Sequence, residues 1–261
     1  MFEELKEKSA FISDMDGVVY HGNHLLPGAA EFIRLLEERQ LRYLFLTNSS
    51  ERTPRELAEK LSRLGVTVAP EHFYTSALAT ADFLARQKPG CSVFAVGEAG
   101  LVNALYEKGI SMNDVDPDYV VIGETRTYSF ERLEKAVRLV LKGARLIGTN
   151  PDLTGPTENG IVPATGSLIA PIELSTGCKA YFIGKPNPFM MRRAVKRLNA
   201  MSRETVIIGD RMDTDIIAGV EAEVDTVLVL SGVTKEADIP RFAYTPKYVM
   251  RGLAELTAAL F

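Results

Sequence analysis

The chain has 261 residues, 46% of them hydrophobic and 25% charged, which is typical of a globular protein with one large or two modest domains. Its formal net charge of −4 and pI near 5.6 argue against nucleic-acid binding, which needs a clustered basic surface. No apolar run of about 18 residues occurs, so the sequence predicts no membrane-spanning helix.

The N-terminus is charged and lacks the apolar segment of a signal peptide. Two cysteines far apart in sequence, Cys91 and Cys178, indicate buried thiols in a reducing environment rather than a disulfide framework. Three histidines in no ligand spacing argue against a histidine-bound zinc site. We therefore expect a cytoplasmic protein.

The first apolar segment, residues 10–13, ends in two carboxylates, Asp14 and Asp16, followed by Gly17. A short continuous apolar run is typical of a buried parallel strand, and ligands of open α/β sheets bind where such strands end. Residues i and i+2 of an extended chain project to the same side, so both carboxylates are expected to face one small volume. Close like charges favour a bound cation or protonation of one partner. The alternative is a pair of solvated loop acids.

Helices and strands are then expected to alternate along the chain. Apolar periodicity, caps and breakers predict strands at 41–46, 73–76, 92–97, 119–123, 145–150, 180–184, 205–210 and 226–230, and helices at 29–40, 53–65, 77–86, 99–108, 130–142, 166–176, 188–200 and up to about 222. A Pro-, Thr- and Gly-rich stretch at 151–164 is expected to be a loop. This order is typical of parallel sheets covered by helices.

Four of these apolar strands end in polar residues of complementary chemistry. They end in Asp14 with Asp16, Thr47 with Asn48, Lys185, and Asp210 with Asp215. If the four strands are parallel neighbours, all four ends open on one edge of the sheet. Each signal alone has an ordinary explanation: a helix-cap loop for Thr47-Asn48, a solvated surface lysine for Lys185, and an N-cap for Asp213 or Asp215. The joint occurrence in this order makes chance an unsatisfactory explanation.

The segments DMDG, LTNSS, GKP and GDRMDTD resemble the four signature motifs of the haloacid dehalogenase (HAD) superfamily of phosphotransferases. The long α/β-patterned stretch between Asn48 and Lys185 resembles the class IIA branch, which contains NagD-like and p-nitrophenyl phosphatase-like hydrolases. The resemblance implies an α/β fold with a Rossmann-like parallel sheet core and helices on both faces (residues 1–77 and 181–261). It also implies an inserted α/β cap domain (residues 78–180) that determines substrate specificity.

The same resemblance implies catalytic roles for the residues of the first two motifs. Asp14 would be the nucleophile that forms an aspartyl-phosphate, with its other oxygen on Mg²⁺. Asp16 would protonate the leaving oxygen and then deprotonate the hydrolytic water, while its backbone carbonyl binds the metal. Thr47, Asn48 and Ser49 would bind the phosphate oxygens, assisted by neighbouring backbone N–H groups.

Roles for the remaining motif residues follow from the resemblance in the same way. Lys185 would balance the charge of nucleophile and phosphate, and Asp210 would complete the metal ligands. Asp215 would act from the next layer, holding Lys185 or a metal-bound water, and Asp213 would be a helix cap. Independently of the resemblance, a phosphate monoester is an anion that a dication helps to neutralise, and hard carboxylate and carbonyl oxygens suit Mg²⁺.

Two loops that follow strands of the middle region are hypothesised to contact the non-reacting part of the substrate. They contain Glu124 with Arg126 and Asn150 with Asp152. The equally weighted alternative is that both loops are ordinary turns. The expected partner is a small phosphorylated metabolite, with neither nucleic acid nor membrane, and a homodimer is possible because relatives often dimerise.

The expected function is Mg²⁺-dependent hydrolysis of small phosphate monoesters of sugar phosphate or nucleoside monophosphate type, through an aspartyl-phosphate. Pyridoxal phosphate and phosphoglycolate also remain open as substrates. The alternatives are a phosphomutase or phosphotransferase of the same superfamily, a non-hydrolysing phospho-acceptor module similar to a response-regulator receiver, and a binding protein without turnover. A dehalogenase would give Asp16 no leaving oxygen to protonate, and no GxGxxG stretch supports a nicotinamide enzyme.

Overall fold

The computed structural model describes residues 3–157 and 160–260. The chain divides into two compact units. Unit 1 comprises residues Met1–Thr47, Leu57–Tyr74 and Lys185–Phe261, and unit 2 comprises Asn48–Glu56 and Thr75–Gly184. None of the described helices is both long and apolar enough to cross a bilayer.

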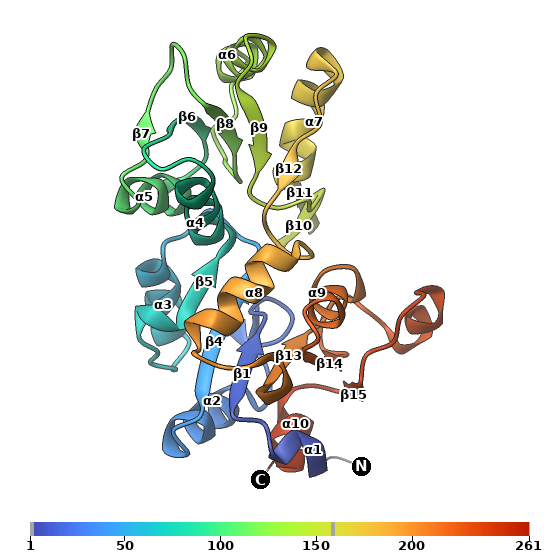
Figure 1. The fold of residues 1–261 in the computed structure, drawn as a ribbon. Coiled ribbons are helices and arrows are strands. Elements are labelled where there is room, and N and C mark those ends of the chain that lie inside the picture. Colours follow the sequence, from blue (N-terminus) through green and yellow to red (C-terminus); the bar gives the residue numbers. More distant parts are fainter. Residues whose placement is uncertain (1–2, 158–159, 261) are drawn as a thin grey trace. The chain divides into compact units, whose positions relative to one another are not determined.

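Unit 1 is built on a six-stranded sheet with the order β15-β14-β13-β1-β4-β5 (Figure 1). Its strands are β1 (Ala10–Ser13), β4 (Arg42–Thr47), β5 (Phe73–Thr75), β13 (Thr205–Gly209), β14 (Asp225–Val229) and β15 (Tyr248–Met250), with a small hairpin of β2 (Tyr20–His21) and β3 (His24–Leu25) after β1. The β1 ladders to β13 and β4 are parallel, as are those from β14 to β13 and β15. The carboxyl ends of β13, β1 and β4 therefore lie side by side.

Helices of unit 1 pack on the apolar faces of this sheet. They are α1 (Glu3–Lys6), α2 (Ala29–Glu38), α3 (Pro54–Arg63), α8 (Pro188–Arg197), α9 (Ile217–Glu221) and α10 (Leu253–Leu260), with 3₁₀ helices at Pro70–His72, Ser202–Glu204 and Glu236–Arg241. Phe11 on β1 packs in one cluster with Phe32 of α2 and Leu256 of α10. Alternate strand residues point to the opposite face, where a Cβ at Gly219 of α9 would lie 2.6 Å from Ile207. The sheet is thus covered on both faces, as expected.

Unit 2 contains a five-stranded parallel sheet with the order β12-β9-β8-β6-β7 (Figure 1). Its elements are β6 (Ser92–Val96), β7 (Ser111–Met112), β8 (Tyr119–Ile122), β9 (Arg145–Gly148), β12 (Tyr181–Phe182), α4 (Ser76–Gln87), α5 (Ala99–Glu107), α6 (Phe130–Leu141) and α7 (Thr165–Thr176). Helices α6 and α7 bury Ala136 and Ile172 against Val120 and Ile122 of β8. The α/β fold class with an inserted second α/β unit is therefore confirmed.

Three expectations about local structure are wrong. The apolar run before Lys185 is expected to be a strand of the same sheet as β1, but only Tyr181–Phe182 is strand, and it pairs with β9 of unit 2. The expected loop at 151–164 contains an antiparallel hairpin of β10 (Thr154–Thr157) and β11 (Gly160–Pro163), while Glu158 and Asn159 lie outside the described residues. Cys91 is buried, but Cys178 is exposed.

Candidate functional site

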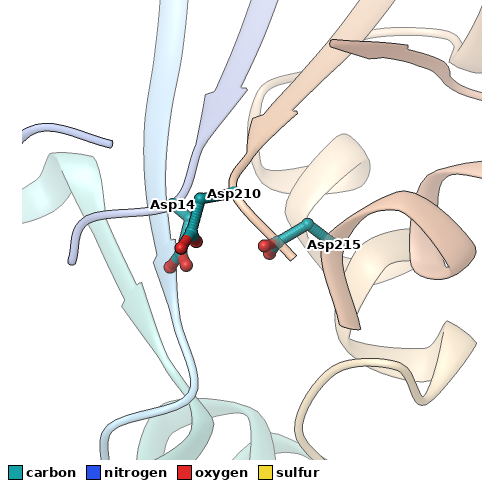
Figure 2. A group of neighbouring side chains, drawn as sticks. All are labelled: Asp14, Asp210 and Asp215. Atoms are coloured by element: carbon teal, nitrogen blue, oxygen red, sulfur yellow. The ribbon is translucent and has the colours of Figure 1, made fainter. Parts of the chain in front are cut away.

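Three carboxylates of unit 1, those of Asp14, Asp210 and Asp215, lie close together (Figure 2). Two of them, Asp14 and Asp215, form ion pairs with Lys185. Asp14 and Asp210 directly follow the adjacent parallel strands β1 and β13, so the sheet itself brings them together. One oxygen from each of the three carboxylates lies within 4.8 Å of the other two. Sequence reasoning therefore placed Asp14 and Asp210 correctly at one edge of the sheet.

Lys185 neutralises part of this charge from a buried position. Its Nζ lies 2.9 Å from Oδ1 of Asp14, 2.6 Å from Oδ1 of Asp215 and 3.1 Å from the carbonyl oxygen of Leu46. The side chain is 1% exposed, so the interpretation of Lys185 as a solvated surface lysine is wrong. It reaches the cluster through the segment between β12 and α8, not from the end of a neighbouring strand.

Burial and nearby charges shift the pKa values of Lys185, Asp210 and Asp215. Burial alone would lower the pKa of Lys185, but the charges of Asp14 and Asp215 and its hydrogen bonds to both raise it above its usual value. Burial raises the pKa of Asp210, and the nearby charges of Asp14 and Asp215 raise it further. Burial also raises the pKa of Asp215, against the opposing effect of Lys185. Three carboxylates beside one ammonium leave the site with an excess of negative charge.

Asp210 has one oxygen that the protein satisfies and one that it does not. Oδ2 accepts a hydrogen bond of 2.7 Å from the backbone N–H of Val233. Oδ1 is buried and has no hydrogen-bond partner among the described residues. Two glycines make room for this carboxylate, because a Cβ would lie 2.5 Å from Oδ2 at Gly17, where φ is +78°, and 2.0 Å at Gly232. A buried carboxylate oxygen without a partner is costly, so this atom marks a place for a ligand.

The donor set fits a hard divalent cation. Both oxygens of Asp215 have partners in the protein, since Oδ1 accepts from Lys185 and Oδ2 accepts from the backbone N–H of Arg211 at 3.2 Å. Asp14 and the unpartnered Oδ1 of Asp210 are left as the carboxylates best able to bind a metal. Mg²⁺ typically takes one or two carboxylates, keeps several waters and completes its shell with substrate phosphate oxygens.

The turn that carries Asp215 places Asp213 and Asp215 in different surroundings. A π-helical turn at Met212–Ile216 buries Asp215 completely. Asp213 is more than half exposed and accepts hydrogen bonds from the guanidinium of Arg211 at 3.0 and 2.8 Å. The expectation that Asp213 caps a helix is therefore wrong, and so is the N-cap alternative for Asp215, because the N-cap position is Arg211.

Asp16 lies apart from the three gathered carboxylates. Strand β1 ends at Ser13, and the chain bends at Met15 before it reaches Asp16. The Asp16 Oδ1 atom is 3.5 Å from Nδ1 of His21, and both side chains are partly exposed. Burial raises the pKa of Asp16, while the charges of His21 and Lys60 oppose the rise. Sequence reasoning missed His21 as a partner of Asp16.

The segment after β4 passes from unit 1 to unit 2 between Thr47 and Asn48. Thr47 is the last residue of β4. In unit 2, the carbonyl oxygen of Asn48 accepts from Ser76 Oγ at 2.5 Å and from Asn150 Nδ2 at 2.8 Å. The Asn48 side-chain amide donates to Oδ2 of Asp152 at 2.8 Å. Asn150 and Asp152 thus hold the loop that the sequence assigned to phosphate binding.

The carboxylate of Glu124 makes a second connection to this loop. Its Oε2 atom accepts hydrogen bonds from Ser49 Oγ and from the backbone N–H of Ser50, both at 2.9 Å. The backbone N–H of Glu124 donates in return to Ser50 Oγ at 3.0 Å. Arg126 is exposed, with its Nε 3.5 Å from Glu51. Each of the four residues proposed for specificity, Glu124, Arg126, Asn150 and Asp152, therefore has a partner within unit 2.

Several residues that the sequence analysis did not identify complete the surroundings of Asp210. The segment after β14 supplies the Val233 N–H and the close-packed Gly232, and the Thr234 N–H donates to the Asp210 carbonyl oxygen at 3.1 Å. Ser231 Oγ donates to the carbonyl oxygen of Gly17 at 2.7 Å and so ties this segment to the loop after β1. The dipeptide Ser231-Gly232 directly after an apolar strand was the available signal.

Comparison with known proteins identifies the family of this chain. The family model described as haloacid dehalogenase-like hydrolase matches residues 11–111, and a second, HAD-hydrolase-like model matches residues 182–256. The chain is 47% identical to dihydroxyacetone phosphatase of Corynebacterium glutamicum over 247 residues, which are 95% of this chain and 90% of that protein. The chain belongs to the haloacid dehalogenase-like hydrolase family.

Other members of this HAD family extend the match to solved structures. Ribonucleotide monophosphatase NagD of Escherichia coli K12 is 44% identical over 94% of this chain and 96% of its own. The NagD structure superposes with a TM-score of 0.90 over 95% of this chain and 98% of that one. The structure of the 4-nitrophenylphosphatase of Thermotoga maritima, which is 35% identical in sequence, superposes with a TM-score of 0.95 over 99% of this chain and 100% of that one. The expected NagD-like and p-nitrophenyl phosphatase-like membership is confirmed, and the chain is an enzyme of this hydrolase family.

Proposed function

We propose that the protein hydrolyses small phosphate monoesters of the sugar phosphate or nucleoside monophosphate type in a Mg²⁺-dependent reaction. The observation that carries the proposal is the group of Asp14, Asp210 and Asp215 beside buried Lys185, with one buried Asp210 oxygen unpartnered among the described residues. An anionic cluster of this kind needs a cation, and a cation beside a carboxylate nucleophile suits phosphoryl transfer. The names of the relatives, which include a dihydroxyacetone phosphatase and a ribonucleotide monophosphatase, support the same reaction class.

In the proposed reaction, a carboxylate oxygen of Asp14 attacks phosphorus, and the ester P–O bond to the leaving group breaks as the new O–P bond forms. Asp16 gives its proton to the leaving oxygen, which departs as an alcohol; the raised pKa of Asp16 supports this role. Water then attacks the aspartyl-phosphate and gives a proton to Asp16. Inorganic phosphate leaves and Asp14 is regenerated.

The other residues of the site orient and neutralise in this proposal. Lys185 holds Oδ1 of Asp14 at 2.9 Å and is itself held by Asp215, so the nucleophile is fixed in one position. Thr47, Asn48 and Ser49 bind phosphate oxygens in this proposal, and the Ser49 hydroxyl also donates a hydrogen bond to Glu124. Asp14, Asp210 and the Asp16 carbonyl would hold Mg²⁺, which when bound supplies positive charge against the phosphoryl oxygens.

Unit 2 is proposed to supply substrate specificity, as is expected for residues 78–180. In this proposal Glu124, Asn150 and Asp152 act by positioning the Asn48–Ser50 loop, because all three are hydrogen-bonded to it. Exposed Arg126 would contact the non-reacting part of the substrate. A cytoplasmic location and a possible homodimer stay predictions from the sequence.

A phosphate-release screen tests the proposed function. Sugar phosphates, nucleoside monophosphates, pyridoxal phosphate and phosphoglycolate are each incubated with the protein, with Mg²⁺ or with a chelator. We expect stoichiometric inorganic phosphate from at least one monoester, only with Mg²⁺. Transfer of the phosphoryl group to a second sugar position, or an aspartyl-phosphate that accumulates without release, would instead identify a mutase or a phospho-acceptor module and overturn the proposal.

A further inference from the structure

Unit 2 contains a hollow of about 490 Å³ that shares no residue with the Asp14 cluster. It is lined by residues of α4, β8, β9 and β12, including Phe83, Tyr119, Arg145 and Tyr181. Tyr119 and Arg145 are register partners on adjacent parallel strands, so their side chains lie on one face of the sheet. A hollow of this volume lies within the range of small-molecule sites, about 300–1,000 Å³.

Tyr119 provides an unsatisfied polar group at this hollow. The residue is 2% exposed, and its hydroxyl oxygen has no hydrogen-bond partner within the described part of the chain. Buried tyrosine hydroxyls ordinarily find a partner, because leaving one unpaired is costly. Tyr119 also lines the hollow, so a ligand that displaces the side chains covering the hydroxyl can accept this hydrogen bond.

Arg145 supplies positive charge beside the tyrosine. Its Cζ atom lies 4.2 Å from the centroid of the Tyr119 ring, and its side chain makes no hydrogen bond or ion pair with any other described residue. A guanidinium stacked on an aromatic ring keeps its N–H edge available for a carboxylate or phosphate. None of the described lining residues is Asp or Glu, and the other lining cation, Lys179, is paired with Glu173 at 3.1 Å. The hollow therefore favours an anion at Arg145.

Two aromatic rings form an apolar wall of the same hollow. The Phe83 and Tyr181 ring centroids are 5.3 Å apart with an interplanar angle of 33°, and Tyr181 is 49% exposed. Exposed aromatic surface beside a cation is suited to a flat ring that carries a negative group. We propose that this hollow binds a small aromatic anion. Its ring lies on Phe83 and Tyr181, and its carboxylate or phosphate group accepts hydrogen bonds from Arg145 and Tyr119.

Titration calorimetry with four probes tests this site. The probes are 2-naphthoate, the non-hydrolysable 2-naphthylphosphonate, neutral 2-naphthylmethanol and ring-free cyclohexanecarboxylate, each with Mg²⁺ and inorganic phosphate present to occupy the catalytic site. We expect one equivalent of an aromatic anion to bind, at least about tenfold more tightly than the neutral or non-aromatic probe. The tighter of carboxylate and phosphonate identifies the anionic group.

Three variants locate the binding. Arg145→Ala should weaken binding by about tenfold or more, whereas Arg138→Ala, an exposed arginine paired with Glu134 on α6, should leave it unchanged. Tyr119→Phe should weaken binding several-fold without lowering the melting temperature, because it removes an unpaired hydroxyl. The proposal is overturned if neither aromatic anion binds saturably, or if Arg145→Ala binds like the wild type.

Discussion

The two units differ in how the protein satisfies the hydrogen-bonding capacity of a carboxylate packed against a turn. In unit 2, Oε2 of Glu124 accepts hydrogen bonds from both Ser49 and Ser50, so its charge is used to hold a loop. In unit 1, Oδ1 of Asp210 is buried with no partner among the described residues and with two further carboxylates nearby. A satisfied carboxylate stabilises the fold, whereas an unsatisfied one costs stability until a cation arrives. The difference separates structural acids from candidate catalytic ones better than burial alone.

The largest expected effect is on turnover, from Asp14→Asn. The substitution keeps the size of the side chain but removes the proposed nucleophile, so phosphate release should fall by about 10³-fold or more. Asp213→Asn is the matched control, because Asp213 is exposed and paired with Arg211 in the same edge region. Phosphate release is measured under saturating substrate, with circular dichroism to verify folding. Near wild-type turnover in folded Asp14→Asn protein would remove Asp14 from the mechanism.

Lys185→Met should have the largest effect on stability. It leaves Asp14 and Asp215 without their buried cation, which should cost about 3–5 kcal/mol of unfolding free energy in urea titrations near pH 8. The loss should shrink toward pH 5, because protonation then neutralises the orphaned carboxylates. Lys179→Met, an exposed lysine paired with Glu173, should change stability by less than about 0.5 kcal/mol. An equally small change for Lys185→Met would contradict the description of the site.

Asp210→Asn should stabilise the metal-free protein at neutral pH, by about 1–3 kcal/mol. The native pKa of Asp210 lies above its ordinary value of 3.8, so between the two values the native state binds more protons than the unfolded chain. The stability of the metal-free wild type therefore falls as the pH rises through that interval, and the variant should show a flatter profile. Chemical unfolding from about pH 5 to about pH 8 measures both slopes. A variant less stable than the wild type at every pH would mean that Asp210 is satisfied in solution.

Glu124→Gln should have the smallest effect on stability and turnover. It tests the comparison with a carboxylate that the protein satisfies. It preserves shape but weakens two charge-assisted hydrogen bonds to the Asn48–Ser50 loop, which should cost about 1–2 kcal/mol of stability and lower turnover less than tenfold. Glu107→Gln, at an exposed position of α5, is the control. Loss of turnover as complete as that of Asp14→Asn would assign Glu124 to the chemistry instead of to loop support.

The sequence predicted most of the sheet and the residues at its edge, for a clear physical reason. Buried parallel strands are continuous apolar runs, and a polar residue after such a run marks the strand end, so the pattern of residues alone locates Asp14 and Asp210. The same rule failed for Lys185, because the run that precedes it is equally compatible with either sheet and pairing with β9 decides. The hairpin of β10 and β11 was not predicted, because Gly and Pro in its strands indicate a loop.

The electrostatic state of the site was beyond sequence reasoning. Spacing shows which acids are near a strand end, but it does not show that Asp215 turns inward and is fully buried while Asp213 is exposed and pairs with Arg211. It also does not show that Asp16 lies beside His21, or that the backbone of Val233 satisfies only one Asp210 oxygen. These features depend on contacts and turn geometry that residue spacing does not encode.

Calorimetric titration of metal-free protein with Mg²⁺ tests the central claim most directly. The claim is that the carboxylates around Lys185 form a binding site for a divalent cation. We expect the wild type and Asp213→Asn to bind one Mg²⁺ per chain, and Asp210→Asn to bind none measurably. The absence of saturable Mg²⁺ binding to the wild type, or equal affinity in Asp210→Asn, would contradict the claim.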